Sequence, residues 1–304
     1  MKIYLNRQPV QGPWGGANKV VVELVKRLKF LQHEVVFNLN HTDIDLIFCF
    51  DPRPNNFQED YNSFLYYKNK FGCKIVQRVG DLGTHSKPEL TNMVKQSIQY
   101  SDFLIFPSEW AKDWIGYTKN NFSIVYNAPL EIFHKYKNDK TIDNKINLIT
   151  HHWSTNPKKG FSFYKQLDDF ITDKFTFTYI GRLPNNMNFK NINYISATGD
   201  NDFLAKKLSE ADIYVTASEE EAGANHVLEA MAAGLPVLYH KDGGSIVNYC
   251  RSIGKSFHDF TTFKQSLDKV CKDFSSYKEK VMSYDKTVYC AISEYEKTIC
   301  NLIK

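Results

Sequence analysis

The segment Ala217–Tyr239, ASEEEAGANHVLEAMAAGLPVLY, decides the fold class of this chain. It follows a short apolar run, Ile213–Thr216, that is typical of a buried strand, and it ends in a second such run, Pro236–Tyr239. Between the two runs lie a polar loop and a helical pattern, for which Asn225 is the expected N-cap. A strand, a helix and a second strand in this order indicate a βαβ unit, which builds a parallel sheet.

The same alternation of short apolar runs and helical patterns extends over the rest of the chain. One polar stretch, KYKNDKTIDNK at residues 135–145, has no apolar periodicity and divides the alternation into two arrays. We therefore expect an α/β fold with two Rossmann-like domains, at residues 1–134 and 146–304, whose parallel sheets face each other across a cleft. The stretch 135–145 would be the linker, and the last helix would pack back on the N-terminal domain. Ligands of such sheets bind beyond the carboxyl ends of the strands.

Composition and charge narrow the functional classes. The chain has 304 residues, of which 42% are hydrophobic and 24% charged, as in an ordinary globular protein. The net charge of +4 is too small to indicate nucleic-acid binding. No apolar run reaches the length of a membrane span or a signal peptide, so we expect a cytoplasmic protein. The Lys-rich C-terminal helix leaves a peripheral contact with the inner face of a membrane open, and the oligomeric state is not indicated.

Several motifs of other enzyme classes are missing from the sequence. No two glycines have the G-x-G spacing, which excludes the dinucleotide fingerprint, and there is no Walker A loop, G-x-S-x-G or H-E-x-x-H motif. The six cysteines include no C-x-x-C pair. Asp43 and Asp45 have D-x-D spacing, but they open a strand of the N-terminal domain. We therefore expect neither a metal site nor a cofactor.

Two carboxylates, Glu221 and Glu229, stand on the loop before the helix and in the helix itself. A helix N-terminus offers free N–H groups and a partial positive charge to a diphosphate. A carboxylate one turn inside the helix can accept hydrogen bonds from ribose hydroxyls, and one on the preceding loop can hold the hydroxyls of a sugar. Acidic residues are also favoured before helix N-termini for electrostatic reasons alone, so the residues by themselves leave both interpretations open.

Four stretches together resemble retaining group-1 (family four) glycosyltransferases of the GT-B fold. The donor-site signature of that family is similar to EAGANHVLEAMAAGLPVLYHKDGG at residues 221–244. GPWGGANKVVVEL at residues 12–24 resembles the glycine loop that opens the first helix. IVYNAPLEIF at residues 124–133 and THHWSTNPKKG at residues 150–160 resemble the end of the N-terminal domain and the first loop of the C-terminal domain. The four stretches occur in the family's order and span most of the chain.

The resemblance implies roles for individual residues. Glu229 would bind the ribose of the nucleotide, Glu221 would contact the donor sugar, and Lys159 would hold the donor diphosphate and stabilise the charge that builds on it when it leaves. Glu221 and Lys159 are thus the expected catalytic residues. The further donor contacts that the resemblance implies are Gly15, Gly16, Gly223, Ala224 and Asn225.

Two stretches depart from the family pattern. One is Ala222–Gly223–Ala224, where relatives often show Gly-Phe-Gly. Many relatives carry an arginine on the first strand of the C-terminal domain, where this chain has His151, His152 and Trp153. Either a histidine supplies part of the positive field or Arg182, after the next strand, does so; Arg182 is preferred as a donor contact. The alternative for Arg182 is a surface arginine that follows a strand.

Contacts with the acceptor or with the sugar are expected from a second set of residues. The stretch QRVGDLGTH at residues 77–85 ends a strand of the N-terminal domain, where relatives place such contacts; the alternative is a strand-end turn with exposed polar residues. Trp14 lies in the glycine loop and either stacks on a sugar ring or covers the first helix. The residues of this set are Trp14, Arg78, Asp81, His85 and His152.

The expected activity is that of a retaining, metal-independent glycosyltransferase of the hexosyl-transferring type. It would move a sugar from a nucleotide-diphosphate donor to a glycan or lipid-linked acceptor during polysaccharide biosynthesis. Two alternatives stay open: a nucleotide-sugar epimerase or hydrolase of the same fold, and a non-catalytic protein that binds a nucleotide sugar. The sequence does not specify the base, the sugar, the acceptor or the linkage.

Overall fold

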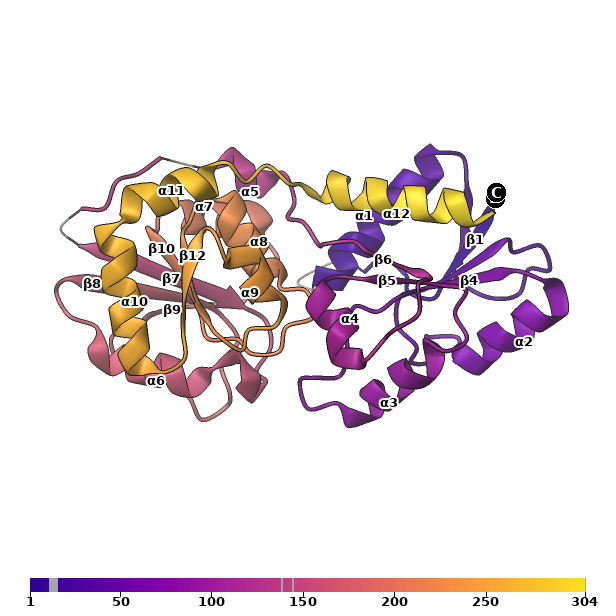
Figure 1. Cartoon of the computed structure of the whole chain (residues 1–304), viewed down its shortest axis with the longest axis horizontal. Coiled ribbons are helices and arrows are strands. Elements are labelled where there is room, and N and C mark those ends of the chain that lie inside the picture. Colours follow the sequence, from indigo (N-terminus) through magenta and orange to yellow (C-terminus); the bar gives the residue numbers. More distant parts are fainter. Residues whose placement is uncertain (11–15, 138, 144, 304) are drawn as a thin grey trace. The chain divides into compact units, whose positions relative to one another are not determined.

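The structure is a computed structural model that describes residues 1–10, 16–137, 139–143 and 145–303 (Figure 1). Its contacts divide the chain into two compact units. The first unit comprises Met1–Asn127 and Val288–Lys304, and the second comprises Ala128–Thr287. The stretch 135–145, for which the sequence predicts a linker, therefore belongs to the second unit, and the last helix belongs to the first.

The first unit is built on a six-stranded parallel sheet with the order β2-β1-β3-β4-β5-β6. Its strands are β1 (Lys2–Leu5), β2 (Glu34–Val36), β3 (Leu46–Cys49), β4 (Lys74–Arg78), β5 (Phe103–Phe106) and β6 (Phe122–Ile124). Its helices are α1 (Gly16–Phe30), α2 (Tyr61–Phe71), α3 (Pro88–Ser97), α4 (Glu109–Ile115) and α12 (Val288–Ile303).

The second unit contains another six-stranded parallel sheet, with the order β12-β11-β10-β7-β8-β9. Its strands are β7 (Ile146–His152), β8 (Phe175–Gly181), β9 (Asn193–Ser196), β10 (Ile213–Thr216), β11 (Val237–His240) and β12 (Gly254–Phe257). Its helices are α5 (Ile132–Lys135), the 3₁₀ turn η1 (Pro157–Lys159), α6 (Phe161–Phe170), α7 (Asn201–Ser209), α8 (Asn225–Ala232), α9 (Ser245–Cys250), α10 (Phe260–Lys272) and α11 (Phe274–Met282).

The central strands of the two sheets are buried on both faces, as the continuous apolar runs of the sequence predict. Every residue of β3 and of β10 is buried. In the second unit Tyr214 packs into the core on one face of the sheet, and its neighbours Ile213 and Val215 pack into the core on the other. The expected α/β fold with two parallel sheets is thereby confirmed.

Capping side chains explain where some helices begin, but not all of them. The Ser108 hydroxyl accepts a hydrogen bond from the Ala111 N–H and caps α4, a position that serine favours. The expected N-cap of α8 was wrong, because Asn225 is the first helical residue and Ala224, which has no side-chain oxygen, takes the cap position. The loop before α8 is held by backbone contacts instead of a capping side chain, as described below.

The last helix, α12, is anchored to the first unit by both apolar and polar contacts. Tyr295 is buried, with its ring 6.1 Å from that of Phe48 on β3. The Arg27 Nε atom on α1 donates to Glu296 over 2.7 Å. Contacts of this kind make the C-terminal segment part of the first unit although it follows the second in sequence.

Both sheets contain one switch point, where neighbouring strands send their following segments in opposite directions along the sheet. In the first unit it lies between β1 and β3, and in the second it lies between β7 and β10. Open α/β sheets bind their ligands beyond the carboxyl ends of the strands at such a point. The topology therefore indicates two places at which to look for functional side chains.

Candidate functional site

The switch point of the second unit brings two loops together. One loop leaves the carboxyl end of β7 and contains η1, and the other leaves β10 and leads into α8. Gly160 makes their close approach feasible, because a Cβ atom there would lie 2.4 Å from the Ala217 Cβ and 2.6 Å from the Ala217 carbonyl oxygen. The Glu219 N–H also donates to the Lys158 carbonyl over 2.8 Å. The two loops thus pack closely against each other beyond the carboxyl ends of the strands.

This packing pairs Lys159 with Glu221. The Lys159 ammonium donates to Glu221 Oε1, and both side chains are largely buried, at 9% and 12% exposure. A second pair, Lys158 with Glu220, lies beside it and is about one-third exposed. The two expected catalytic residues, 62 positions apart in the sequence, are therefore in direct contact in the structure.

The position of Glu221 is set by the turn after β11. The Glu221 N–H donates to the Gly243 carbonyl over 3.3 Å, and the Glu221 carbonyl accepts from the Ser245 N–H over 2.9 Å. Gly244 has a φ of +67°, and a Cβ there would lie 2.5 Å from the Glu221 carbonyl oxygen. Only glycine combines that backbone conformation with so close an approach. Three strands, β7, β10 and β11, therefore cooperate in placing one carboxylate.

Glu229 lies on α8 and contacts β7 through His151. The His151 Nε2 atom lies 2.8 Å from Glu229 Oε2, and both side chains are almost completely buried. The other ring nitrogen of His151 lies 3.2 Å from the hydroxyl of Tyr214 on β10. The second expected carboxylate is thus held between the two strands of the switch point.

His152, the next residue of β7, points to the other face of the sheet, as strand alternation requires. Its ring packs among aromatic side chains, 5.0 Å from the ring of Tyr179 and 5.5 Å from that of Phe161. Burial lowers the pKa of His152 well below its ordinary value, and the nearby Lys159 acts in the same direction. His152 is therefore a neutral core group, and its expected contact with a sugar stays a prediction.

The other donor contacts expected in the second unit lie around the same loops. Gly223 and Ala224 precede α8, and the Ala224 N–H donates to the Ser245 hydroxyl over 3.3 Å. Asn225 is partly exposed at the start of α8. Arg182 follows β8 with an exposed side chain, which makes no ion pair with any described residue.

In the first unit, Arg78 has a structural role. It is 4% exposed, its Nε atom donates to the Tyr295 hydroxyl over 2.9 Å, and Nη2 donates to Asn127 Oδ1 over 3.0 Å. Asp81 pairs with Lys87 over 2.8 Å. The contacts of Arg78 tie the end of β4 to the last helix. A role of Arg78 or Asp81 toward an acceptor stays a prediction.

Four further expected residues come near the start of the chain or after β4. His85 is partly buried in the turn before α3. Gly16 is the first residue of α1. Trp14 and Gly15 lie outside the described residues.

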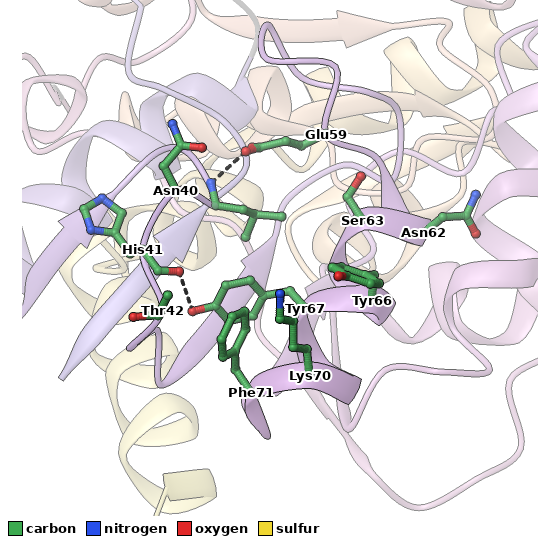
Figure 2. A pocket seen from close by; sticks show the side chains of 11 residues that line it. Asn40, His41, Thr42, Glu59, Asn62, Ser63, Tyr66, Tyr67, Lys70 and Phe71 are labelled. Atoms are coloured by element: carbon green, nitrogen blue, oxygen red, sulfur yellow. Dashed lines mark hydrogen bonds between the residues drawn. The ribbon is translucent and has the colours of Figure 1, made fainter.

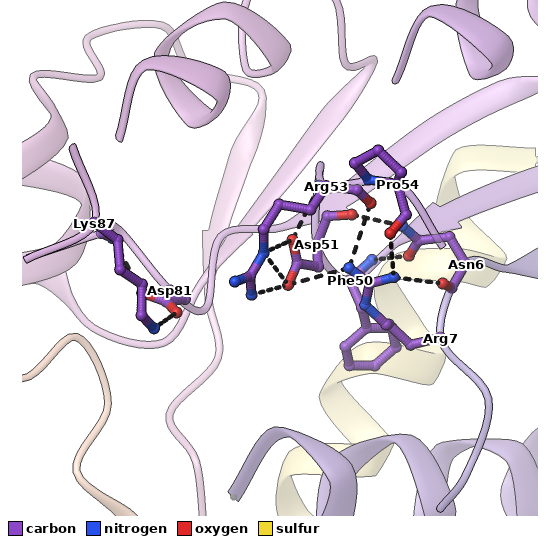
Figure 3. A network of polar contacts seen from close by, with 9 residues as sticks. Asn6, Arg7, Phe50, Asp51, Arg53, Pro54, Asp81 and Lys87 are labelled. Atoms are coloured by element: carbon purple, nitrogen blue, oxygen red, sulfur yellow. Dashed lines mark hydrogen bonds and ion pairs between the residues drawn. The ribbon is translucent and has the colours of Figure 1, made fainter. Parts of the chain in front are cut away.

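One polar network at the switch point of the first unit is not among the residues expected from the sequence (Figure 3). The Asn6 side chain, after β1, accepts from the Phe50 N–H over 2.7 Å and donates to the Asp51 carbonyl over 2.5 Å. Arg53 and Arg7 both contact the Asp51 carboxylate, with Arg7 Nη2 at 3.3 Å. Burial alone would raise the pKa of Asp51, but the two guanidinium groups hold it below its ordinary value. The residues of this network follow β1 and β3 directly, and that position is the signal by which the sequence could have indicated them.

No group of three or more His, Cys, Asp or Glu side chains in residues 1–10, 16–137, 139–143 and 145–303 is arranged to hold a metal ion. Over the same residues, every helix is too short or too polar to span a lipid bilayer.

Comparisons with known proteins point to the same part of the chain. Residues 151–252 match the family model described as glycosyl transferases group 1, a region that contains Lys159, Glu221 and Glu229. None of the curated proteins matches the chain in sequence.

Solved structures match the fold over the whole length. The Anabaena protein HepE, in complex with UDP and glucose, has a TM-score of 0.69 at 13% identity, and the match covers 98% of this chain and 99% of HepE. Sucrose-phosphate synthase from Thermosynechococcus elongatus has a TM-score of 0.72 at 11% identity, with coverages of 99% and 98%. AviGT4, a glycosyltransferase of avilamycin A biosynthesis, has a TM-score of 0.64 at 14% identity, again with 99% and 98% covered. At such identities the comparison establishes the GT-B fold.

Proposed function

We propose that the chain is a glycosyltransferase that moves a sugar from a nucleotide-diphosphate donor to a glycan or lipid-linked acceptor. The observation that carries this proposal is the convergence of Lys159, Glu221 and Glu229 at one switch point, inside the region that matches the group-1 family model. A cation and two carboxylates at the carboxyl edge of a parallel sheet supply the groups that a diphosphate linked to two polyhydroxylated rings requires.

Lys159 would bind the donor diphosphate. In the chain alone its charge is compensated by Glu221. A diphosphate near the same ammonium would take over that compensation and free the Glu221 carboxylate to accept hydrogen bonds from the hydroxyls of the donor sugar. When the sugar–phosphate bond breaks, negative charge builds on the leaving diphosphate, and a fixed cation stabilises it. The partial positive charge at the N-terminus of α8 would stabilise the same negative charge.

Glu229 would hold the ribose. Its Oε2 atom contacts His151, so the carboxylate has a defined orientation before any ligand arrives. A carboxylate can accept hydrogen bonds from vicinal hydroxyls. We assign the orientation of Glu229 to His151, while Arg182, exposed after β8, is retained as a contact for the diphosphate.

The stereochemistry and the proton balance follow from the family resemblance. We propose that the transfer retains the anomeric configuration and needs no divalent ion. The acceptor hydroxyl attacks the anomeric carbon from the side of the leaving group, the bond to the diphosphate oxygen breaks, and that oxygen receives the hydroxyl proton. No protein base is then required. Assembly of a surface polysaccharide or lipid-linked glycan in the cytoplasm is the setting that we propose.

Thermal unfolding in the presence of nucleotides tests this proposal. UDP is the first ligand to try, because HepE is described in complex with UDP and glucose; GDP, CDP, the matching sugar nucleotides and NAD complete the set. A ligand at 100 times its dissociation constant adds about 2.7 kcal/mol to the stability of the folded state. We expect one nucleotide to raise the unfolding temperature of the wild type, and to have at least tenfold lower affinity for Glu229→Gln. Stabilisation by NAD alone, or by none of the set, would contradict the proposal.

A further inference from the structure

A groove of about 540 Å³ runs along α2 in the first unit (Figure 2). Helix α2 forms one wall and the segment 39–42 forms the other. Because α2 returns between β3 and β4 of a parallel sheet, the groove extends from the carboxyl side of the sheet toward its amino side. It contains none of the residues at the switch point of this unit, and the glycosyltransferase proposal does not use it.

The walls of the groove are held in place by hydrogen bonds. The Tyr67 hydroxyl donates to the His41 carbonyl over 2.8 Å and accepts from the Ile44 N–H over 3.0 Å. At the other end the Glu59 carboxylate accepts from the Leu39 N–H over 2.7 Å. The segment 39–42 is therefore tied to α2 at one end and to Glu59, just before α2, at the other, and the groove is preformed.

Aromatic rings line the α2 side of the groove. Tyr66 is 66% exposed and Phe71 is 39% exposed, which is unusual for side chains of this size. The Lys70 ammonium lies 5.6 Å from the Tyr66 ring and 5.2 Å from the Phe71 ring. Exposed aromatic faces on a fixed helix offer flat apolar area at a low cost in conformational entropy.

Polar side chains with unused hydrogen-bonding capacity surround these rings. Asn62 lies one turn before Tyr66 on the same face of α2, and Asn40 and Thr42 lie on the opposite wall. The side chains of Asn40 and Thr42 make no hydrogen bond with any residue that the structure describes. The Asn62 Nδ2 atom donates to Asp60 Oδ2 over 3.4 Å, and each amide keeps its oxygen and at least one N–H for a ligand.

The groove has little net charge. Lys70 and Glu59 are its formal cation and anion. The Glu59 carboxylate is already engaged, since it also accepts from the Tyr4 hydroxyl over 2.7 Å and from Asn55 Nδ2 over 2.8 Å. An anionic ligand would meet only Lys70, and a strongly apolar ligand would desolvate the amides without replacing their hydrogen bonds. The lining matches a neutral molecule that presents both C–H faces and many hydroxyls.

We propose that the α2 groove binds a neutral glycan chain, with pyranose rings against Tyr66 and Phe71 and hydroxyls on Asn40, Thr42 and Asn62. The identification of the ligand rests on the proposed glycosyltransferase function, because such an enzyme handles a growing glycan. The groove would hold sugars of the acceptor chain that lie several units away from the hydroxyl that reacts. It would therefore favour long acceptors over short ones.

Binding to an array of neutral and anionic glycans, without any nucleotide, tests this proposal on the full-length chain. We expect the wild type to retain at least one neutral oligosaccharide, and Tyr66→Ala to bind it at least tenfold more weakly. Tyr66→Phe keeps the aromatic face and should bind nearly as the wild type does. Tyr100→Ala is the matched control, because Tyr100 is 59% exposed in the same unit but does not line the groove.

Several outcomes would overturn the proposal: retention of no glycan, retention of anionic glycans or anionic phospholipid vesicles alone, or equal losses in Tyr66→Ala and Tyr100→Ala. Since Tyr66 is largely exposed, all three variants should unfold at the wild-type temperature. Nucleotide binding is measured separately on Tyr66→Ala and should be unchanged. Loss of glycan binding with intact nucleotide binding would separate the groove from the donor site, and glycan binding without nucleotide binding would contradict only the proposed enzymatic function.

Discussion

The two switch points of this molecule have the same topology but different chemistry. In the second unit, Lys159 and Glu221 form an ion pair that is largely shielded from water, and Glu229 and His151 form another buried contact. In the first unit, Asp51 pairs with Arg53 and Arg7, whose side chains are 41% and 29% exposed. A buried charge depends strongly on its partner, whereas an exposed one is compensated by water. The second switch point therefore keeps charged side chains buried although their removal from water is costly. We interpret this as the mark of a functional site.

The largest effect is expected from Lys159→Met. The substitution leaves Glu221 buried without its cation, which typically costs about 3–5 kcal/mol of stability. The double variant Lys159→Met/Glu221→Leu should recover most of that loss, because it removes both charges. Lys158→Met is the matched control, since the Lys158–Glu220 pair is about one-third exposed. Urea unfolding measures the three variants, and equal losses for Lys158→Met and Lys159→Met would remove the contrast between buried and exposed pairs.

The transfer rate should also depend more on Lys159 than on Lys158. If Lys159 stabilises the leaving diphosphate, Lys159→Met lowers the transfer rate by about 10²–10³, while Lys158→Met changes it little. Release of the nucleotide diphosphate from the donor identified by thermal unfolding provides the assay. A Lys159→Met variant that folds and retains the wild-type rate would remove this residue from the mechanism.

A second comparison concerns the packing of the two loops at the second switch point. Gly160→Ala introduces a Cβ atom that meets the Ala217 side chain and carbonyl, in addition to the strain of a φ of +80°. Gly116→Ala has a similar φ of +74° with nothing within 4 Å of the added atom. We expect Gly160→Ala to lose about 1–3 kcal/mol more than Gly116→Ala. Equal losses in chemical denaturation would show that the close approach of the loops is not required.

The contributions of His152 in the second unit and of Asp51 in the first unit to stability should depend on pH in different ranges. His152 has a lowered pKa in the folded state, so below its unfolded value of about 6.5 the unfolded chain binds more protons. Its contribution to stability is present above pH 6.5 and is lost as the pH falls through that value. The unfolding temperature of the wild type should therefore fall between pH 7 and 5 more than that of His152→Phe. Parallel curves for the two proteins would refute this assignment.

Asp51 should act in a more acidic range. Its pKa is also lowered, so its contribution is present above the unfolded value of about 3.9 and is lost as the pH falls toward the folded value. Asp51→Asn should thus show a weaker decline in stability below pH 4 than the wild type. A difference between the two proteins that persists unchanged from pH 4 to pH 2 would contradict the stated role of the arginines.

The smallest effect is expected from Arg53→Gln at the first switch point. An ion pair whose cation is 41% exposed contributes less than about 1 kcal/mol. The loss should shrink further in 1 M salt, because ions screen exposed charges. A loss of several kcal/mol that does not respond to salt would place this network in the same class as the buried pair of the second unit.

Much of the fold could be predicted because apolar periodicity reports directly on strands and helices. The apolar run Ile213–Thr216 coincides with β10, and the run Pro236–Tyr239 matches β11 (Val237–His240) with a shift of one residue. The start of α8 was harder to predict. Asn225 has the side chain of an N-cap, but the backbone contacts of Gly244 and Ser245 decide where this helix begins.

The site was predictable to the extent that its residues lie within short motifs. Lys159, Glu221 and Glu229 stand in such motifs, and the structure brings Lys159 against Glu221. The contact between His151 and Glu229 depends on which face of β7 each histidine occupies, and two adjacent histidines do not reveal this in the sequence. The network around Asp51 and the α2 groove join residues from separate segments without any motif. The place of the network after two strands is its one signal in the sequence, and the groove has none.

Hydrogen–deuterium exchange with and without the stabilising nucleotide tests the central claim most directly, because it locates the ligand on the chain. The account predicts slower exchange in the loop after β7 that contains Lys159, and in residues 217–229 at the second switch point. The same peptides of Glu229→Gln should show little change at the same nucleotide concentration. Slower exchange confined to the first unit, or no change anywhere, would contradict the assignment of the donor site.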